Sequence, residues 1–395
     1  MPAQTPRILV ILALALGAFA IGTSEFVAMG LLPWYQADLQ ITEAMAGHVV
    51  SAYAIGVVVG APLTSVIFAR APRRQYLAGL IAFFAVMNLA SALLQGYVPL
   101  LLSRFMAGLP HGGFLGVGML MAADAMPPGQ RAKGLTQVML GLTVANIIGV
   151  PLASTLGQML GWRWGFALPG VLGLASGLLV WLLAPRSGAS PDARPMDELK
   201  GLTNPSVILV LLVGAIGFGG VFAIYSFLTA AMLATAAPPA WAIPLTLAAY
   251  GIGATAGTMW AGRLTNAMGA LPACALLLAI MALSQVLSFF AVGIWPAMML
   301  TTLLLGGASG MGIPLSARLM DVAGSAQSMA AAMNHAAFNA ANALGPWLAG
   351  MALEAGWGWR APSVVAVALT LAGIVMLGLT MLHARLDRRT LPQNA

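Results

Sequence analysis

An ionisable side chain stands in the middle of a long apolar stretch near the N-terminus. Of the ten acidic residues, Glu25 is the only one well inside such a stretch, which runs over residues 8–32. A charge there costs about 3 kcal/mol or more, so the residue is a functional hypothesis by default. Burial favours the protonated form of a carboxyl group, which suits Glu25 to bind and release a proton. We interpret Glu25 as a proton-coupling and substrate-binding residue. The alternative is a structural carboxyl that is bonded by a neighbouring helix.

Arg104 is the only basic residue inside an apolar stretch, at residues 98–124. It lies about six residues from one end of its stretch, and Glu25 lies about seven residues from the corresponding end of its own, which at about 1.5 Å per residue gives matching depths. We therefore predict that Arg104 pairs with Glu25, directly or through water, and takes part in proton coupling. The alternative is an arginine that only extends to the membrane surface.

Other polar residues interrupt the apolar runs. His111 follows Pro110 and is a further candidate for proton coupling and substrate binding, or a hydrogen-bonded packing residue. His335, Asn339 and Asn342 are spaced i, i+4 and i+7, which places them on one helix face. Hydrocarbon offers such side chains no partners, so this face should meet either a substrate cavity or another helix.

The predicted substrate contacts also include apolar and aromatic residues. Phe26 and Met29 lie close to Glu25 in the same stretch, and Phe222 and Tyr225 belong to a stripe within residues 218–229. Aromatic and methionine side chains form large, adaptable apolar walls. For the aromatic stripe, plain core packing is the alternative interpretation.

The composition indicates that lipid is the main solvent of the elements that carry these residues. Hydrophobic residues make up 60% of the chain, charged residues make up 7%, and the mean hydropathy is +0.93. Soluble domains carry roughly 25% charged residues. In lipid, only helices and closed barrels satisfy their own backbone hydrogen bonds. The apolar runs are too long and too uniform for the alternating strands of a barrel, so we predict helices.

The apolar segments fall into two groups of six. The longest connection, residues 185–204, is rich in Pro, Ser and charged residues. We predict an all-α membrane protein with twelve transmembrane helices: an N-terminal six-helix bundle (1–184), a cytoplasmic linker (185–204) and a C-terminal six-helix bundle with a short cytoplasmic tail (205–395). The predicted spans are 8–32, 44–69, 76–95, 98–124, 133–157, 164–184, 205–233, 241–265, 271–291, 296–320, 327–352 and 360–383.

The basic residues set the predicted orientation. Fourteen of the seventeen Lys and Arg residues lie at the termini, in the linker or in loops on one side, whereas only Arg163 and Arg360 lie on the other. The positive-inside rule therefore predicts a multi-pass protein of the inner (plasma) membrane with both termini in the cytoplasm. The net charge of +7 then reports topology and not a nucleic-acid surface. We expect a monomer whose partners are the lipid bilayer, a small-molecule substrate and protons.

The two groups of segments repeat each other in the same order. Three matches recur 194 to 197 residues apart, which indicates a parallel repeat of two six-helix units. The matches are Gly112–Gly118 with Gly306–Gly312, Ala145–Gly149 with Ala341–Gly345, and Trp162-Arg163 with Trp359-Arg360.

Several other classes of chemistry lack their motifs. A phosphate-binding P-loop ends in Gly-Lys, but the two lysines, Lys133 and Lys200, follow Ala132 and Leu199. The four histidines form no His-Glu-x-x-His pattern, and the single cysteine, Cys274, cannot form a disulfide within the chain. We expect no metal or organic cofactor.

These residues resemble a known family over almost the whole chain. The runs Gly22-Thr23-Ser24-Glu25-Phe26-Val27, Gly30-Leu31-Leu32-Pro33 and Gly108-Leu109-Pro110-His111-Gly112 resemble the arabinose-efflux-type subgroup of the twelve-helix drug:proton antiporters, which belong to the major facilitator superfamily. The resemblance implies efflux. It also implies a proton-coupling role for Arg104, which with Gly108 matches the family motif of the fourth helix.

Two conformational motifs of that family are present in altered form. The loop motif Asp-Arg-x-Gly-Arg-Arg corresponds to Ala69–Arg74, so Arg70, Arg73 and Arg74 are kept and the Asp and Gly are missing. Arg70 could still meet Asp124 on the same membrane face. The antiporter motif Gly-x-x-x-Gly-Pro corresponds to Ala145–Pro151, where Gly149 is kept and Pro151 comes one place late.

The predicted function is proton-coupled export of small organic molecules, such as drugs or other amphipathic compounds, by alternating access. Export of a specific sugar or nucleoside is the alternative, because Asn, His and Tyr side chains would suit it. A membrane-embedded enzyme would need several converging titratable groups, so we predict that the protein is not an enzyme.

Overall fold

The computed structural model describes residues 7–67, 71–127, 129–186, 204–323 and 327–390. Most of the predicted linker, and Arg70, lie outside these residues. The described part of the N-terminal half contains α1 (Arg7–Gly30), α2 (Leu32–Leu39), α3 (Glu43–Ile67), α4 (Arg73–Leu93), α5 (Tyr97–Gly108), α6 (His111–Ala125), α7 (Arg131–Val144), the π-helix η1 (Ala145–Gly149), α8 (Val150–Leu160) and α9 (Trp162–Leu183).

The C-terminal half has a corresponding set of helices. It contains α11 (Pro205–Gly217), α12 (Gly219–Thr235), α13 (Ala242–Met268), α14 (Ala270–Ala291), α15 (Trp295–Ala308), the 3₁₀-helix η3 (Ser309–Met311), α16 (Gly312–Val322), α17 (Gln327–Glu354) and α18 (Ala361–Thr390). Breaks such as those between α5 and α6 or between α11 and α12 divide single membrane crossings into two helices.

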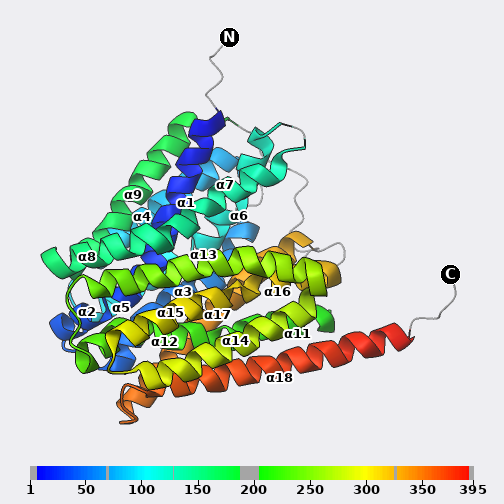
Figure 1. Cartoon of the computed structure of the whole chain (residues 1–395). Helices are drawn as coiled ribbons and strands as arrows, with labels where there is room; N and C mark the ends of the chain where they lie inside the picture. Colours follow the sequence, from blue (N-terminus) through cyan, green and yellow to red (C-terminus); the bar gives the residue numbers. More distant parts are fainter. Residues whose placement is uncertain (1–6, 68–70, 128, 187–203, 324–326, 391–395) are drawn as a thin grey trace.

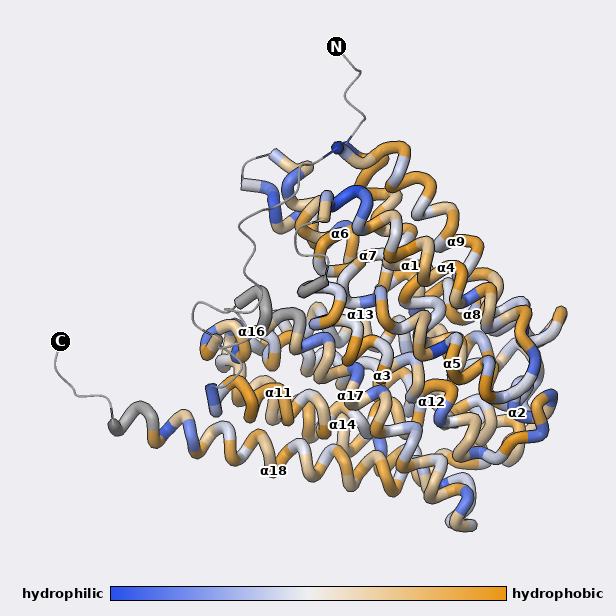
Figure 2. Tube along the Cα trace, turned by 180° about the vertical axis from the view of Figure 1, so that it is seen from behind, coloured by the Kyte–Doolittle hydropathy of each residue, from blue (hydrophilic) through white to orange (hydrophobic). Residues whose placement is uncertain are grey.

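The chain forms twelve transmembrane segments. Within the described residues, ten helices or broken helices are long and apolar enough to cross a membrane. The other two segments are α13 and α17, which have 27 and 28 residues and are richer in small and polar side chains. In Figure 2 apolar residues run along the lengths of the helices, while many of the hydrophilic residues lie near helix ends. The structure thus has the predicted twelve-helix architecture.

The two halves converge at one end of the molecule and diverge at the other (Figure 1). We call the diverging end, which holds the start of α1 and the end of α18, the termini side, and the end with α2 the opposite side. Contacts between the halves near the opposite side are close, since Ser51 Oγ donates to Ala343 O at 2.8 Å and Gly47 packs against the backbone of Pro346. The opposite side is therefore the closed side in this conformation.

Glycine contacts show how the repeat is built. Gly56 of α3 packs on the carbonyl of Phe105, and Gly253 of α13 packs in the same way on the carbonyl of Leu303. Correspondingly, Gly108 meets the Tyr53 carbonyl and Gly306 meets the Tyr250 carbonyl. Small residues allow such close approach of membrane helices. Each half therefore uses the same backbone-to-backbone contact between its second and fourth segments.

This contact corrects one of the three repeat matches. Gly306 corresponds to Gly108 and not to Gly112, so the predicted match is wrong by one helical turn. The reason is that both helices carry glycines four residues apart, Gly108 and Gly112 in one and Gly306 and Gly310 in the other. A four-residue shift therefore superimposes glycine on glycine without changing the face of the helix.

Replacing Gly56 by Val is expected to destabilise the N-terminal half by about 3 kcal/mol or more, because the new side chain would overlap the Phe105 carbonyl. The matched control is Gly79→Val, because a Cβ at Gly79 would meet no atom within 4 Å. Thermal denaturation in detergent should show a large drop for the first variant only. Equal midpoints for the two variants would contradict this account of the packing.

Candidate functional site

Glu25 lies in α1 and faces the space between the two halves. Its neighbours Ser24 and Val27 are fully buried, whereas Glu25 and Phe26 are only partly buried. Asn342 of α17 donates from Nδ2 to Glu25 Oε1 at 3.1 Å. This hydrogen bond joins residues 317 positions apart and connects the N-terminal half to the C-terminal half. A change in the protonation of this carboxyl group therefore alters a contact between the two halves.

Arg104 is fully buried behind Glu25 in a polar cluster within the N-terminal half. Its Nη1 donates to Ser24 Oγ at 2.8 Å and to Asn88 Oδ1 at 3.1 Å, and its Nη2 donates to the Ser24 carbonyl at 2.8 Å. The Ser24 hydroxyl in turn donates to Asn88 Oδ1. The guanidinium also lies 4.4 Å from the ring centre of Tyr53 and 5.0 Å from that of Phe166, within the range of cation–π attraction.

The structure shows no direct pair between Arg104 and Glu25 in this conformation, and it rules out the alternative of an arginine at the membrane surface. Among the ion pairs of the described residues, none joins Arg104 to Glu25, and full burial of Arg104 excludes an arginine that reaches the membrane surface. Successive residues of a helix point about 100° apart, so an arginine that holds Ser24 approaches α1 from a different side than the one Glu25 faces. Depth along the helix is predictable from residue counts, but direction around it is not.

Ser24 and Asn88 were not predicted as site residues. Asn88 lies in the apolar segment 76–95, where a lone amide needs a partner, and that signal was available in the sequence. Ser24 gives no such signal because a serine can bond its own helix backbone. Together these two residues fix Arg104 against the turn of α1 that carries Glu25.

His111 begins α6, directly after the break that follows α5. Its Nδ1 lies 3.1 Å from the Tyr53 hydroxyl, and the two rings meet edge to face. Tyr53 therefore contacts both Arg104 and His111. Two of the three predicted proton-coupling residues, Arg104 and His111, thus contact the same tyrosine. The third, Glu25, follows Ser24, the residue that Arg104 binds.

The polar face of α17 is buried, as expected if it does not meet lipid. Asn342 and Asn339 are 1% and 5% exposed, and His335 is partly buried. Asn339 donates from Nδ2 to the His335 carbonyl at 3.1 Å, which is a bond within the helix. Of the three residues, Asn342 contacts the other half through Glu25, so this position joins the two halves.

Aromatic residues from both halves close the space on one side of Glu25. The ring of Phe26 lies 6.2 Å from that of Phe222, 5.9 Å from that of Tyr225 and 6.1 Å from that of Tyr250. Phe26 comes from α1, and the other three come from α12 and α13. Tyr250 was not predicted, because its segment carries no aromatic stripe. Met29 is fully buried in the apolar core and does not face open space in this conformation.

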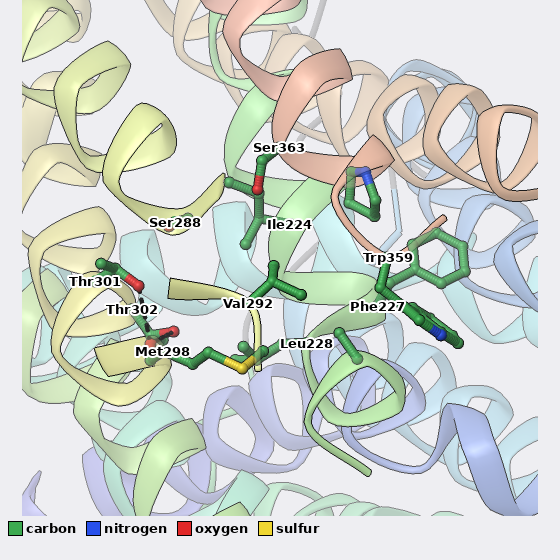
Figure 3. A pocket seen from close by; sticks show the side chains of 12 residues that line it. Ile224, Phe227, Leu228, Ser288, Val292, Met298, Thr301, Thr302, Trp359 and Ser363 are labelled. Carbon is green, nitrogen blue, oxygen red and sulfur yellow. Dashed lines mark hydrogen bonds between the residues drawn. The ribbon is translucent and has the colours of Figure 1, made fainter. Parts of the chain in front are cut away.

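Among the described residues, the C-terminal half has no charged counterpart of Arg104. Thr302 occupies the position that corresponds to Arg104, and Gln285 the one that corresponds to Asn88. Thr301 and Thr302 both donate to the Met298 carbonyl beside a void of about 20 Å³ (Figure 3). That volume suffices for about one water molecule and not for a substrate. In the described part of the chain, the fully buried arginine thus belongs to the N-terminal half alone.

On the termini side, Asp124 at the end of α6 accepts from Arg73 at 2.6 Å and from Arg131 at 2.6 Å. Asp124 thus pairs with both Arg73 and Arg131, while the contact considered for Arg70 lies outside the described residues. Arg74 instead lies over the Trp181 ring at 4.7 Å. These contacts connect α4, α6 and α7 at the surface where the halves diverge.

The altered antiporter motif coincides with the π-helix η1. Gly149 ends η1 and packs against Thr23 and Phe19 of α1, and Pro151 follows in the first turn of α8. A π-turn accommodates one extra residue in a helix. The altered motif therefore coincides with an irregular turn that packs against α1.

On the opposite side, Asp38 of α2 is bound to the start of α9. It accepts from Arg163 Nη1 at 2.7 Å and from Trp162 Nε1 at 3.0 Å. The hydrogen bonds from Arg163 and then Trp162 hold the pKa of Asp38 below its ordinary value. Asp38 therefore stays ionised and keeps α2 attached to the N-terminal half.

The sequence matches those of known membrane transporters. Residues 14–237 and 232–394 each match the Major Facilitator Superfamily. The inner membrane transport protein YdhP of Escherichia coli (strain K12) is 34% identical over 97% of both chains. A chloramphenicol resistance protein of Streptomyces lividans is 34% identical over 91% of this chain and 94% of that one. A bacterial homologue of the human lysosomal transporter Spinster, solved in an inward-facing conformation, shares the fold with a TM-score of 0.70 at 16% identity, covering 96% of each chain.

Proposed function

Because the chain belongs to the major facilitator superfamily, we propose that it is a proton-coupled exporter of small organic molecules that works by alternating access. The observation that carries this proposal is the hydrogen bond between Glu25 and Asn342. It puts the one acidic residue inside the transmembrane region at the contact between the two halves. A titratable group at that place can couple proton binding to the movement of the halves.

The coupling follows from the chemistry of the carboxyl group. An ionised Glu25 accepts the hydrogen bond from Asn342, whereas a protonated carboxyl has one oxygen that donates and competes less well as an acceptor. Charge-assisted hydrogen bonds are roughly twice as strong as neutral ones. Protonation therefore weakens the connection between α1 and α17 and frees the halves to return inward, whereas on the outward step a bound substrate takes the place of that connection. Arg104 holds the Ser24 carbonyl and keeps the Glu25 turn in place during that movement.

Export is the proposed direction because relatives of this chain are named for drug resistance and sugar efflux, and the orientation sets which side a substrate leaves from. We place the termini side in the cytoplasm, because the excess of Lys and Arg lies in its loops and termini. The halves then diverge on the cytoplasmic side and are in contact on the outer side through the Phe26 aromatic contacts and the Ser51–Ala343 bond. A substrate enters from the cytoplasm, and a proton arrives at Glu25 when the halves open outward. We expect the exporter to act as a monomer in the inner membrane, with the proton gradient as its energy source.

The experiment that tests this proposal is transport into proteoliposomes under an imposed pH gradient, across a panel that includes drugs, sugars and nucleosides. We expect at least one small amphipathic compound to move against its own gradient and to drive proton movement in the opposite direction. Accumulation that is unaffected by collapsing the pH gradient would contradict proton coupling. Transport of sugars or nucleosides alone would favour the more specific permease.

A further inference from the structure

Two asparagines occupy corresponding positions in the two halves. Gly22 of α1 packs against Ala145, and Gly219 of α12 packs against Ala341. The residues that follow these alanines are Asn146 in η1 and Asn342 in α17. Both helices therefore present an asparagine at the same level, next to the first helix of their own half.

Each of these asparagines uses its donor and leaves its acceptor unpaired. Asn146 Nδ2 donates to the Leu142 carbonyl at 3.1 Å, and Asn342 Nδ2 donates to Glu25 at 3.1 Å. Their Oδ1 atoms are buried and have no hydrogen-bond partner. Such an acceptor has lost its water without gaining a protein donor, so it favours any ligand that supplies an N–H or O–H group.

The surroundings of the two acceptor atoms, Asn146 Oδ1 and Asn342 Oδ1, differ, and this difference indicates the chemistry of a ligand. Gly22 corresponds to Gly219, so the position that corresponds to Glu25 is Phe222. Asn342 therefore has the Glu25 carboxylate as its partner. At the position that corresponds to Glu25, the C-terminal half has the aromatic ring of Phe222. The hydroxyl of Tyr225, one turn from Phe222, is also buried without a partner. Unpaired polar atoms thus lie beside a mainly aromatic wall.

Resting on the proposed function, we propose that Asn146 and Asn342 select the substrate by accepting hydrogen bonds from it. The substrate class is then an amphipathic molecule with at least two N–H or O–H donors beside an apolar body. A site with buried acceptors discriminates strongly against analogues that lack donors, because those analogues leave the acceptors unpaired. Lipophilic cations without donors should be poor ligands even though Glu25 is acidic.

The test uses binding measured by thermal shift and calorimetry on purified protein. The probes are chloramphenicol, which has two hydroxyls and an amide N–H, its di-O-methyl ether, arabinose, and tetraphenylphosphonium, which has no donor. We expect chloramphenicol to bind at least about tenfold more tightly than its ether, since each lost hydrogen bond costs about that factor. Tighter binding of tetraphenylphosphonium, equal binding of the ether, or no binding of any donor-bearing probe would overturn the assignment.

Variants separate selection from a structural role. Asn146→Leu should weaken chloramphenicol binding about tenfold, whereas Asn146→Asp, which keeps acceptor oxygens at this position, should retain it. The matched control is Asn334→Leu, since Asn334 of α17 donates to Ser316 within the C-terminal half. If Asn146→Asp loses binding to the same degree as Asn146→Leu, the residue is structural and the inference fails.

The same probes distinguish failure of this inference from failure of the proposed function. Proton movement driven by tetraphenylphosphonium and not by chloramphenicol would leave proton-coupled export standing and overturn the donor rule. Chloramphenicol binding that obeys the donor rule without any proton movement would overturn proton-coupled export and leave the ligand assignment standing.

Discussion

Replacing Glu25 by Gln is expected to reduce proton-driven export to the level of liposomes without protein, while the protein remains folded. Glutamine has the shape of glutamate and its carbonyl can still accept from Asn342, but it cannot bind or release a proton. Exchange of a neutral substrate without a gradient should survive, because it needs no protonation. The measurement is substrate accumulation under an imposed pH gradient, together with exchange at equal pH.

The matched control for this experiment is Glu354→Gln. Glu354 is the last residue of α17, on the opposite side, and it is exposed. Its replacement by Gln therefore removes a carboxylate in the same way, but outside the site. Accumulation should be unchanged in this variant. Concentrative export by a well-folded Glu25→Gln protein would remove Glu25 from the mechanism.

The second large effect is expected at Arg104. Arg104→Met removes three hydrogen bonds and leaves the Ser24 carbonyl without its buried donor, which should lower stability by about 2–4 kcal/mol. Arg104→Lys keeps the charge but not the planar fork that reaches Ser24 and Asn88 together, so it should fold better than Arg104→Met and still transport poorly. Thermal denaturation and proteoliposome transport of both variants test these expectations.

Arg163→Met is the control for the loss of an arginine. Arg163 is partly exposed and paired with Asp38, so its loss should cost at most about 1 kcal/mol. A double-mutant cycle adds a second test. Arg104 and Asn88 share a hydrogen bond and should be non-additive, and Arg104 and Glu25 should be coupled through the Ser24 turn. Stability losses for Arg104→Met no larger than those for Arg163→Met would contradict the role of the buried cluster.

The sequence was sufficient for the architecture because lipid imposes simple rules. Apolar length predicts a crossing, and loop charges predict which ends share a side. It was also sufficient to single out Glu25, Arg104 and Asn342, because a polar side chain in an apolar helix must find a partner. Asn342 then proved to be the partner of Glu25.

The contacts among those residues were less predictable. Arg104 and Glu25 have matching depth, but their partners depend on rotation about the helix axes and on the crossing of α1 with α4 and α5. Ser24 and Tyr250 gave no signal because serine and tyrosine are common in membrane helices without special roles. The repeat alignment failed at Gly112 because glycines one turn apart are equivalent in composition and only the contact with Tyr53 or Tyr250 distinguishes them.

The most direct test of the account is proton release on substrate binding in weakly buffered detergent solution, using a compound that the protein transports. We expect the wild-type protein to release protons in proportion to bound substrate, because the substrate displaces the proton from Glu25. The Glu25→Gln variant should bind the same compound without releasing protons. Equal release by the two proteins, or binding by the wild-type protein with no release at any pH, would contradict proton coupling through Glu25.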